Sequence, residues 1–257
     1  MRFKGTLICI HGFLGQTRDW DPILPMAYHS VRVDLFSSQA QVKFPRIKAP
    51  QKDLKNLGSW MNKTLKDLKT PRILIGYSLG GRLALHALLS HPTPWSGAVL
   101  ISTHPGFSEN TEKQKRVKAD EVWAKRFEED SWDSVIQDWN NQPVFLKSKP
   151  SPYRHGPEFS RKSLAHALRC YSLGKQNLLE QLHELSVPTL WIYGDLDLKF
   201  KQIHKELSLK ALPLVKTLSI PSAGHRVLFE QAEKVQQALV EYLERREDLD
   251  SDPKILS

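Results

Sequence analysis

A serine flanked by glycines, in the stretch Gly76-Tyr77-Ser78-Leu79-Gly80, constrains the fold of this chain more than any other feature. Residues 72–75 before it form a short apolar run, which predicts a buried strand. Residues 81–89 after it are good helix formers, which predicts a helix. A serine at such a strand-to-helix joint is typical of a nucleophile elbow, whose tight turn needs glycine on both sides. We therefore expect the Ser78 hydroxyl to stand clear of a sheet, over the positive end of the following helix.

Length and composition suit one large α/β domain with room for a lid. A chain of 257 residues can bury a substantial core, and its 40% hydrophobic and 25% charged residues are values of globular proteins. No apolar run approaches membrane-spanning length, and the N-terminal residues have no signal-peptide pattern. Cys9 and Cys170 are too few for a disulfide framework or a zinc site. These observations predict a soluble, cytoplasmic protein without a metal site.

The chain is basic, with 37 Lys and Arg against 28 Asp and Glu and a net charge of +9. Such an excess can serve a nucleic acid, an anionic membrane or an acidic substrate. The lysines are scattered along the whole chain, and no basic stripe with interleaved aromatic residues is present. We therefore expect no nucleic acid and no membrane as partner, and we interpret most of the charge as a solubility bias. The expected assembly is a monomer or a small homo-oligomer.

Strands alternate with helices along most of the chain, which predicts a mostly parallel sheet with helices on both faces. The predicted strands cover residues 6–10, 30–36, 72–75, 97–103, 187–193 and 215–220. The predicted helices cover residues 53–69, 81–89, 199–212 and 227–246, with a short helix opening at Asp19 and a loop at 37–52. The predicted organisation is a core of residues 1–103 and 183–246, a helical and tryptophan-rich lid of residues 104–182, and a tail of residues 247–257.

A serine nucleophile or base needs an imidazole, and the imidazole needs a carboxylate that orients it. In folds with a nucleophile elbow the three residues follow in the order Ser, acid, His. His225 stands after the last predicted strand, and Asp195 and Asp197 stand after the one before it. Asp195 directly follows Gly194 and could simply close the turn, whereas Asp197 lies further into the loop. We therefore favour Ser78, His225 and Asp197 as the triad, with Asp195 as the alternative acid.

A Gly-rich turn follows the first predicted strand, in His11-Gly12-Phe13-Leu14-Gly15. In this architecture such a turn supplies one donor of an oxyanion hole, and the residue after the nucleophile supplies the other. The backbone N–H groups of Phe13 and Leu79 are the candidates. His11 stands at the strand end, where we expect a structural role.

Several further stretches resemble a single family. They are residues 76–82, His104-Pro105-Gly106-Phe107, Arg116, residues 120–127, residues 138–145, and Asp197-Leu198-Lys199-Phe200. The set covers nearly the whole chain and is similar to that of 2-succinyl-6-hydroxy-2,4-cyclohexadiene-1-carboxylate synthase of menaquinone biosynthesis. The resemblance implies an α/β-hydrolase fold, with a mostly parallel sheet, helices on both faces and an inserted helical lid.

The resemblance also implies a lyase that removes pyruvate from 2-succinyl-5-enolpyruvyl-6-hydroxy-3-cyclohexene-1-carboxylate without a cofactor. Ser78, backed by His225 and Asp197, would take a ring proton from this substrate. The Phe13 and Leu79 amides would hold the negative charge that develops.

The substrate so implied is a small polycarboxylate, and its three carboxylates give arginines a task. Arg82 lies one turn beyond Ser78, and Arg116 begins the lid. A guanidinium meets a carboxylate in two parallel hydrogen bonds, which lysine cannot imitate. By resemblance, Arg82 and Arg116 bind the substrate and Trp139 lines the lid side of the pocket. Arg154 or Arg161 could supply a further substrate arginine.

The sequence departs from the family after Asp34, where Leu35-Phe36-Ser37-Ser38 replaces the Pro-Gly-His-Gly turn common in relatives. Two other functions are compatible with the elbow. One is a serine esterase or carbon–carbon bond hydrolase that uses the same triad through water. The other is a non-catalytic binding protein of the hydrolase fold, which would have no physical need of an elbow, an acid, a histidine and two donor loops together.

Overall fold

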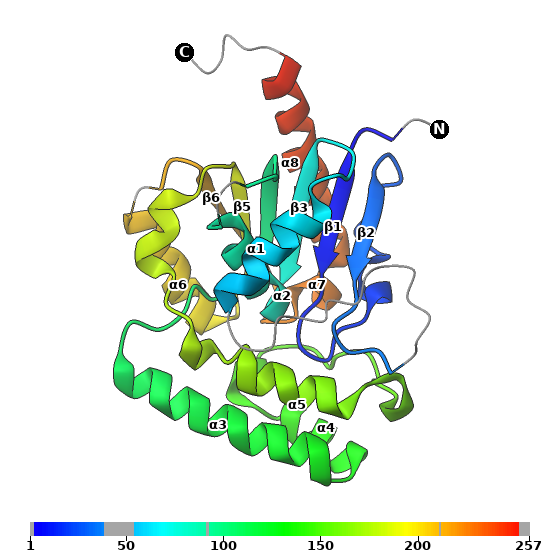
Figure 1. The fold of residues 1–257 in the computed structure, drawn as a ribbon, viewed down its shortest axis with the longest axis vertical. Helices are drawn as coiled ribbons and strands as arrows, with labels where there is room; N and C mark the ends of the chain where they lie inside the picture. Colours follow the sequence, from blue (N-terminus) through cyan, green and yellow to red (C-terminus); the bar gives the residue numbers. More distant parts are fainter. Residues whose placement is uncertain (1–2, 39–53, 91–92, 211, 252–257) are drawn as a thin grey trace.

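A parallel sheet lies at the centre of the computed structural model, which describes residues 3–38, 54–90, 93–210 and 212–251 (Figure 1). Within these residues the sheet has six strands, in the order β2-β1-β3-β4-β5-β6, and every neighbouring pair is parallel. The strands are β1 (Thr6–Ile10), β2 (His29–Val33), β3 (Arg72–Tyr77), β4 (Gly97–Ile101), β5 (Thr189–Gly194) and β6 (Val215–Ile220). The mostly parallel sheet predicted from the sequence is confirmed, and all carboxyl ends of its strands meet at one edge.

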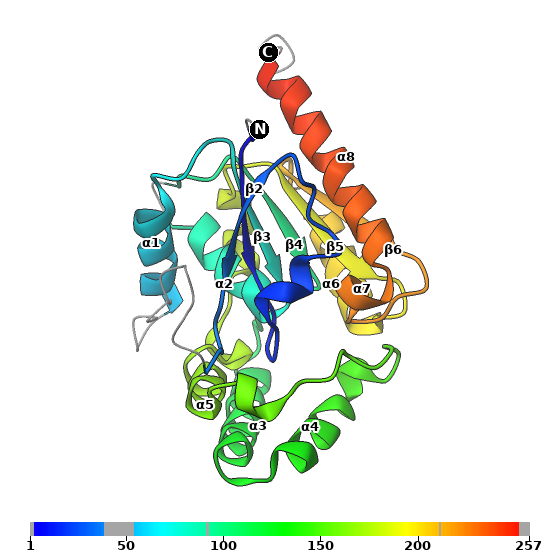
Figure 2. The same cartoon turned by 90° about the vertical axis from the view of Figure 1, so that its right-hand side faces the viewer.

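Helices cover both faces of the sheet because successive strand residues point to opposite sides and are apolar on both. In β1, Ile8 and Ile10 join a core with α1 (Leu54–Leu65), α2 (Leu79–Leu88) and α6 (Leu198–Leu209). The alternate residues Leu7 and Cys9 join a second core on the other face. That second core includes side chains of α7 (Val227–Glu230) and α8 (Ala232–Ser251). Figure 2 shows the sheet between α1 and α2 on one side and α8 on the other.

Three helices between β4 and β5 lie across the carboxyl edge of the sheet, at the bottom of Figure 1. They are α3 (Asn110–Glu129), α4 (Trp132–Asn140) and α5 (Arg161–Cys170). The buried side chains Phe127 of α3 and Leu164 of α5 belong to the same core cluster as one face of the sheet. This inserted layer is therefore held to the sheet by shared apolar burial, and it covers the edge at which site residues are expected.

Two predicted boundaries near the N-terminus are wrong, in each case because an aspartate bonds to nearby backbone. The short helix does not open at Asp19. A 3₁₀ turn over Thr17–Trp20 ends there instead, and the Asp19 carboxylate accepts a hydrogen bond from the Gln16 N–H at its start. β2 ends at Val33 instead of residue 36. The Asp34 carboxylate accepts hydrogen bonds from the N–H groups two and three residues further on, which turns the chain away from the sheet.

The C-terminal helix also differs from its predicted extent. It is divided at Gln231 into α7 and α8, and α8 runs to Ser251, so the expected tail of residues 247–257 begins inside a helix. Residues 252–257 lie outside the described residues, as does most of the predicted loop at 37–52. No helix in the described ranges is long and apolar enough to cross a membrane.

Candidate active site

Ser78 occupies a strained turn between β3 and α2. Its backbone has φ 51° and ψ −109°, a region that side-chain-bearing residues rarely adopt. The turn can be this tight because its neighbours lack side chains. A Cβ on Gly76 would lie 2.5 Å from the Gly81 Cα, and one on Gly80 would lie 2.0 Å from the Ile10 carbonyl oxygen. The Ser78 hydroxyl therefore stands at the N-terminus of α2, as the elbow motif predicts.

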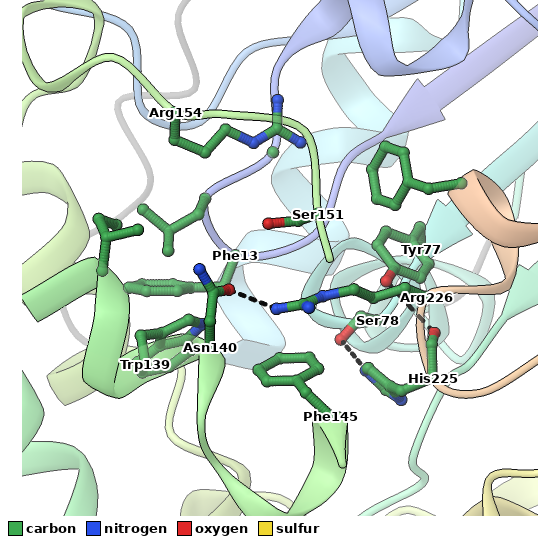
Figure 3. Close-up of a pocket in the computed structure, with 14 residues that line it drawn as sticks. Phe13, Tyr77, Ser78, Trp139, Asn140, Phe145, Ser151, Arg154, His225 and Arg226 are labelled. Atoms are coloured by element: carbon green, nitrogen blue, oxygen red, sulfur yellow. Dashed lines mark hydrogen bonds between the residues drawn. The ribbon is translucent and has the colours of Figure 1, made fainter. Parts of the chain in front are cut away.

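Three side chains from separate parts of the chain form one hydrogen-bonded row beside this turn, and Figure 3 shows the Ser78–His225 pair of that row. Ser78 Oγ lies 3.1 Å from His225 Nε2, and His225 Nδ1 lies 3.0 Å from Asp197 Oδ2. Nδ1–H donates to the carboxylate, which leaves Nε2 to accept the serine proton. The other carboxylate oxygen of Asp197 caps α6 by accepting from the Phe200 N–H at 3.3 Å. Asp195 does not contact the imidazole; its carboxylate closes the turn onto a backbone N–H of the His225 loop.

The His225 loop is fixed from beneath by two hydroxyl groups that the sequence reasoning did not single out. Ser102 Oγ and Tyr77 OH both donate to the His225 carbonyl oxygen, at 2.9 and 3.3 Å. The His225 loop also packs closely against the start of the loop that carries Asp197. A Cβ on Gly194 would lie 2.2 Å from the Ala223 carbonyl oxygen. These contacts set where the imidazole stands relative to Ser78.

The Phe13 and Leu79 amides, predicted as oxyanion-hole donors, lie at the two backbone turns around Ser78. Leu79 is the first residue of α2, and Phe13 and Ser78 line the same cavity. In the part of the chain that the structure describes, neither N–H donates a hydrogen bond to another group. His11 anchors the Phe13 turn: its ring is buried, and its Nε2 accepts from the Leu35 N–H at 3.1 Å. This contact agrees with the structural role that we expect for His11.

A cavity of about 120 Å³ opens on one side of Ser78 and His225 and is strongly basic. Arg82, Arg116 and Lys199 line it, and no carboxylate does. Arg82 donates to the Tyr171 carbonyl oxygen at 2.6 Å, and burial together with the nearby Arg116 lowers its pKa to about 9. Arg116 is paired with the carboxylate of Asp120 at 2.8 Å. A set of converging and only partly compensated cations of this kind is a site for an anion with more than one negative charge.

A second cavity, of about 50 Å³, adjoins the first and shares Ser78, His225, Trp139 and Phe145 with it. Figure 3 shows aromatic side chains around it, with the guanidinium groups of Arg154 and Arg226 among them. Trp139 of α4 lines both cavities, so its predicted place on the lid side of the pocket agrees with the geometry. The Ser78 hydroxyl therefore stands between a basic and an aromatic compartment.

The two arginines proposed as a further substrate ligand are both occupied elsewhere. Arg154 forms a buried, bidentate ion pair with Asp19 at 2.9 and 2.8 Å, although it lines the second cavity. Arg161 does not line either cavity and donates to the backbone carbonyls of Phe127 and Asp130, at the end of α3. Its contacts are those of a residue that closes a helix end.

Among the His, Lys and Arg residues that line the two cavities, three were missed from the sequence as site residues: His104, Lys199 and Arg226. Each could have been found by position. His104 follows β4 closely at the carboxyl edge, Lys199 stands two residues after Asp197, and Arg226 follows His225. Across the described ranges, no three His, Cys, Asp or Glu side chains gather as a set that could hold a metal ion.

Comparison with known proteins places this geometry in a family. The model of the alpha/beta hydrolase fold family matches residues 5–232. A 2-succinyl-6-hydroxy-2,4-cyclohexadiene-1-carboxylate synthase of Pectobacterium atrosepticum is 31% identical over 230 residues, which cover 85% of this chain and 86% of the relative. A synthase of the same name from Photorhabdus laumondii is 31% identical over 227 residues, covering 85% and 78%.

Solved structures agree with these relatives. MenH from S. aureus superposes with a TM-score of 0.82 at 26% identity and covers 96% of each chain. An esterase from Exiguobacterium antarcticum, at 20% identity and a TM-score of 0.73 over 95% and 93% of the two chains, shares the fold. The chain thus has the α/β-hydrolase fold with an inserted helical lid. Within that fold it belongs to the family of 2-succinyl-6-hydroxy-2,4-cyclohexadiene-1-carboxylate synthases.

The burial of His104 in the basic cavity predicts how the folding stability depends on pH. Its ring is 8% exposed, and its Nδ1 accepts from the Gly106 N–H at 3.0 Å. Burial, with smaller contributions from Lys199 and Arg82, lowers its pKa to about 2. In the unfolded chain the pKa of a histidine is about 6.5. The unfolded state therefore binds a proton below about pH 6.5 that the native state does not, so folding stability falls as the pH drops.

Urea unfolding of the wild type and His104→Gln at pH 7.5, 6.5 and 5.5 measures this effect. Below pH 6.5 the wild type should lose up to about 1.4 kcal/mol per pH unit more than the variant does. Equal pH slopes for the two proteins, or a histidine NMR titration that assigns a midpoint near 6.5 to His104, would contradict the prediction.

Proposed function

We propose that this chain catalyses the reaction for which its relatives are named. It eliminates pyruvate from 2-succinyl-5-enolpyruvyl-6-hydroxy-3-cyclohexene-1-carboxylate and leaves 2-succinyl-6-hydroxy-2,4-cyclohexadiene-1-carboxylate, in menaquinone biosynthesis. The observation that carries the proposal is the Ser78–His225 pair opening onto a cavity lined by Arg82, Arg116 and Lys199. A base beside several cations suits a proton abstraction from a substrate with three carboxylates.

The ring positions in the names of the substrate and the product show which bonds change. The ring hydrogen on C2 lies next to the succinyl carbonyl and is the acidic one. Ser78 Oγ takes this proton while its own proton passes to His225 Nε2, 3.1 Å away. The electron pair forms the C2–C3 double bond, the C3–C4 double bond moves to C4–C5, and the bond from C5 to the enolpyruvyl oxygen breaks. The enolpyruvate that leaves takes up a proton and becomes pyruvate.

Two groups of the site stabilise the charges that this step creates. The Asp197 carboxylate, 3.0 Å from Nδ1, stabilises the His225 imidazolium. The negative charge that develops on the succinyl carbonyl oxygen is held by the Phe13 and Leu79 N–H groups, at the positive end of α2. No water is consumed and no acyl-enzyme forms, so the hydrolase geometry serves an elimination.

The carboxylates of the substrate are bound by the basic cavity. Asp120 holds the Nε of Arg116 at 2.8 Å and so orients the guanidinium, whose remaining N–H groups are left for a ligand. Arg82 is held by neutral oxygens, of Tyr171 and Gln176, and keeps its full charge for an anion. Lys199 adds a cation at the exposed rim, with Nζ 5.1 Å from the centre of the Phe107 ring.

The wider setting is part of the same proposal. The chain works on this small polycarboxylate without nucleic acid or membrane, as a monomer or a small homo-oligomer, in the cytoplasm. Its relatives are named for one step in the conversion of a small molecule, and its 37 basic residues are spread along the chain without forming a stripe. Both features support a freely diffusing biosynthetic enzyme.

The function is tested by supplying the enolpyruvyl substrate and measuring pyruvate with a coupled dehydrogenase. The wild type should release pyruvate with saturation, and Ser78→Ala should lose at least about 1,000-fold in kcat because the base is removed. Circular dichroism and Tm should stay close to those of the wild type, because alanine keeps the Cβ and the backbone of the turn. A variant that keeps a substantial rate would show that Ser78 is not the base. If the wild type hydrolyses p-nitrophenyl acetate rapidly and releases no pyruvate, the result supports a serine hydrolase instead.

The acid of the triad is tested by two neighbouring substitutions. Asp197→Asn should lower the rate of pyruvate release by about 1,000-fold or more, because an amide leaves His225 in the wrong tautomer. Asp195→Asn is the matched control, since its carboxylate only closes the turn, and it should cost less than about tenfold. The reverse ranking would move the orienting role to Asp195.

The arginines are tested by Arg82→Lys and Arg116→Ala at low and high salt. A charge-assisted hydrogen bond in a closed site contributes about 1.5–3 kcal/mol, so each change should lower kcat/KM for the substrate by about ten- to a hundredfold. Wild-type kcat/KM should itself fall as salt rises. Any turnover of a neutral aryl ester should change little, because such an ester has no carboxylate. Wild-type kcat/KM in both variants would show that these arginines do not bind the substrate.

A further inference from the structure

Two arginines line the smaller cavity beside Ser78, and they differ in how their charges are compensated. Arg154 is neutralised by its bidentate ion pair with Asp19, and both side chains are 5% exposed. Arg226 donates to the Asn140 side-chain oxygen and, at 3.2 Å, to the Lys149 carbonyl oxygen. Both of these acceptors are neutral. Across the described residues, no carboxylate forms an ion pair with Arg226.

The charge of Arg226 is buried as well as uncompensated. The residue is 5% exposed, and its guanidinium lies 4.0 Å from the centre of the Phe145 ring. The carboxylate of Glu230 contributes some attraction from a distance, but one of its oxygens is used by the Gly224 N–H at 2.9 Å. Burying a cation without a paired anion is costly, so such groups in a cavity point to an anionic ligand.

The placement of Arg226 relative to the base is visible in Figure 3. Its side chain extends across the cavity toward Asn140, above Phe145, with Ser78 beside it. The cavity of about 50 Å³ has space for a group of a few heavy atoms, such as a carboxylate, rather than for a six-membered ring. Arg82 and Arg116 line the other cavity and not this one, although Ser78 and His225 line both.

We propose that Arg226 binds one carboxylate of the substrate in this smaller cavity, so that the carboxylates are divided between the two sides of Ser78. The inference rests on the proposed function and adds to it a substrate residue that follows the triad histidine directly. A guanidinium has five N–H donors, so Arg226 can keep its two lid contacts and still donate to a carboxylate. With cations on both sides, the ring would be held across the Ser78 hydroxyl.

The alternative role for Arg226 is purely structural. Its backbone N–H donates to Ser148 Oγ at 3.2 Å, and its side chain reaches Asn140 and Lys149, all of them in the inserted layer. In that case Arg226 would only fasten residues 140–149 to the His225 loop. An experiment must therefore change the charge of Arg226 while keeping this fastening.

Asn140→Asp does so, because it keeps the oxygen that accepts from Arg226 and adds the negative charge that would compensate the guanidinium. KM for the enolpyruvyl substrate should rise by about tenfold or more, with kcat within about threefold and Tm unchanged or higher. Arg226→Gln should raise KM at least as much. The matched control is Arg169→Gln, an arginine of the same layer that pairs with Glu121 and Glu128 away from both cavities and should leave KM unchanged.

The outcomes separate the two roles. An unchanged or lower KM in Asn140→Asp overturns the inference, as does an Arg226→Gln variant that loses rate on the substrate and on a neutral aryl ester equally. Such results with a wild type that releases pyruvate leave the proposed function standing. A wild type that releases no pyruvate overturns the proposed function, and this inference with it.

Discussion

The approach of α2 to β1 is the contact on which the site depends. A Cβ on Gly80 would stand 2.0 Å from the Ile10 carbonyl oxygen, so the helix can lie this close only without a side chain there. This short distance between α2 and β1 determines the strained backbone of Ser78 and the position of the α2 N-terminus. It also determines how closely the turn that carries Phe13 approaches Ser78. A shift of the helix would move the Ser78 hydroxyl and the Leu79 amide away from their places relative to the Phe13 amide.

Two cavities adjoin Ser78: one is lined mainly by cations, and the other by aromatic rings together with Arg154 and Arg226. Arg82, Arg116 and Lys199 form the basic compartment, and the charges of Arg82 and Lys199 have no carboxylate partner among the described residues. Lys199 is exposed and Arg82 and Arg116 are half-buried, so solvent screens Lys199 more than the two guanidinium groups. A site of this kind favours a polyanion over the neutral esters that hydrolases of the same fold cleave.

The sequence predicted those parts of the site that are fixed by backbone position. The elbow, the histidine after the last strand and an acid after the penultimate one follow from chain order, and the hydrogen bonds of Asp197 place it rather than Asp195 against His225. The strand ends at Val33 and the turn at Asp19 could not be predicted, because side-chain bonds to the backbone decide them. The position of Arg226 after His225 could have marked it as a site residue, but the sequence could not show that its acceptors, more than seventy positions away, are neutral.

The inserted layer has no core of its own. Phe127 and Leu164 belong to the same apolar cluster as the sheet, and the ring of Phe13 lies 5.2 Å from that of Phe127 and 4.5 Å from that of Trp139. A segment that shares its interior with the rest of the domain is not an interchangeable cassette. Exchanging it with that of another hydrolase would leave apolar surface unmatched on both parts and would displace the Phe13 turn. In this chain the residues that surround the substrate site therefore belong to one jointly folded body.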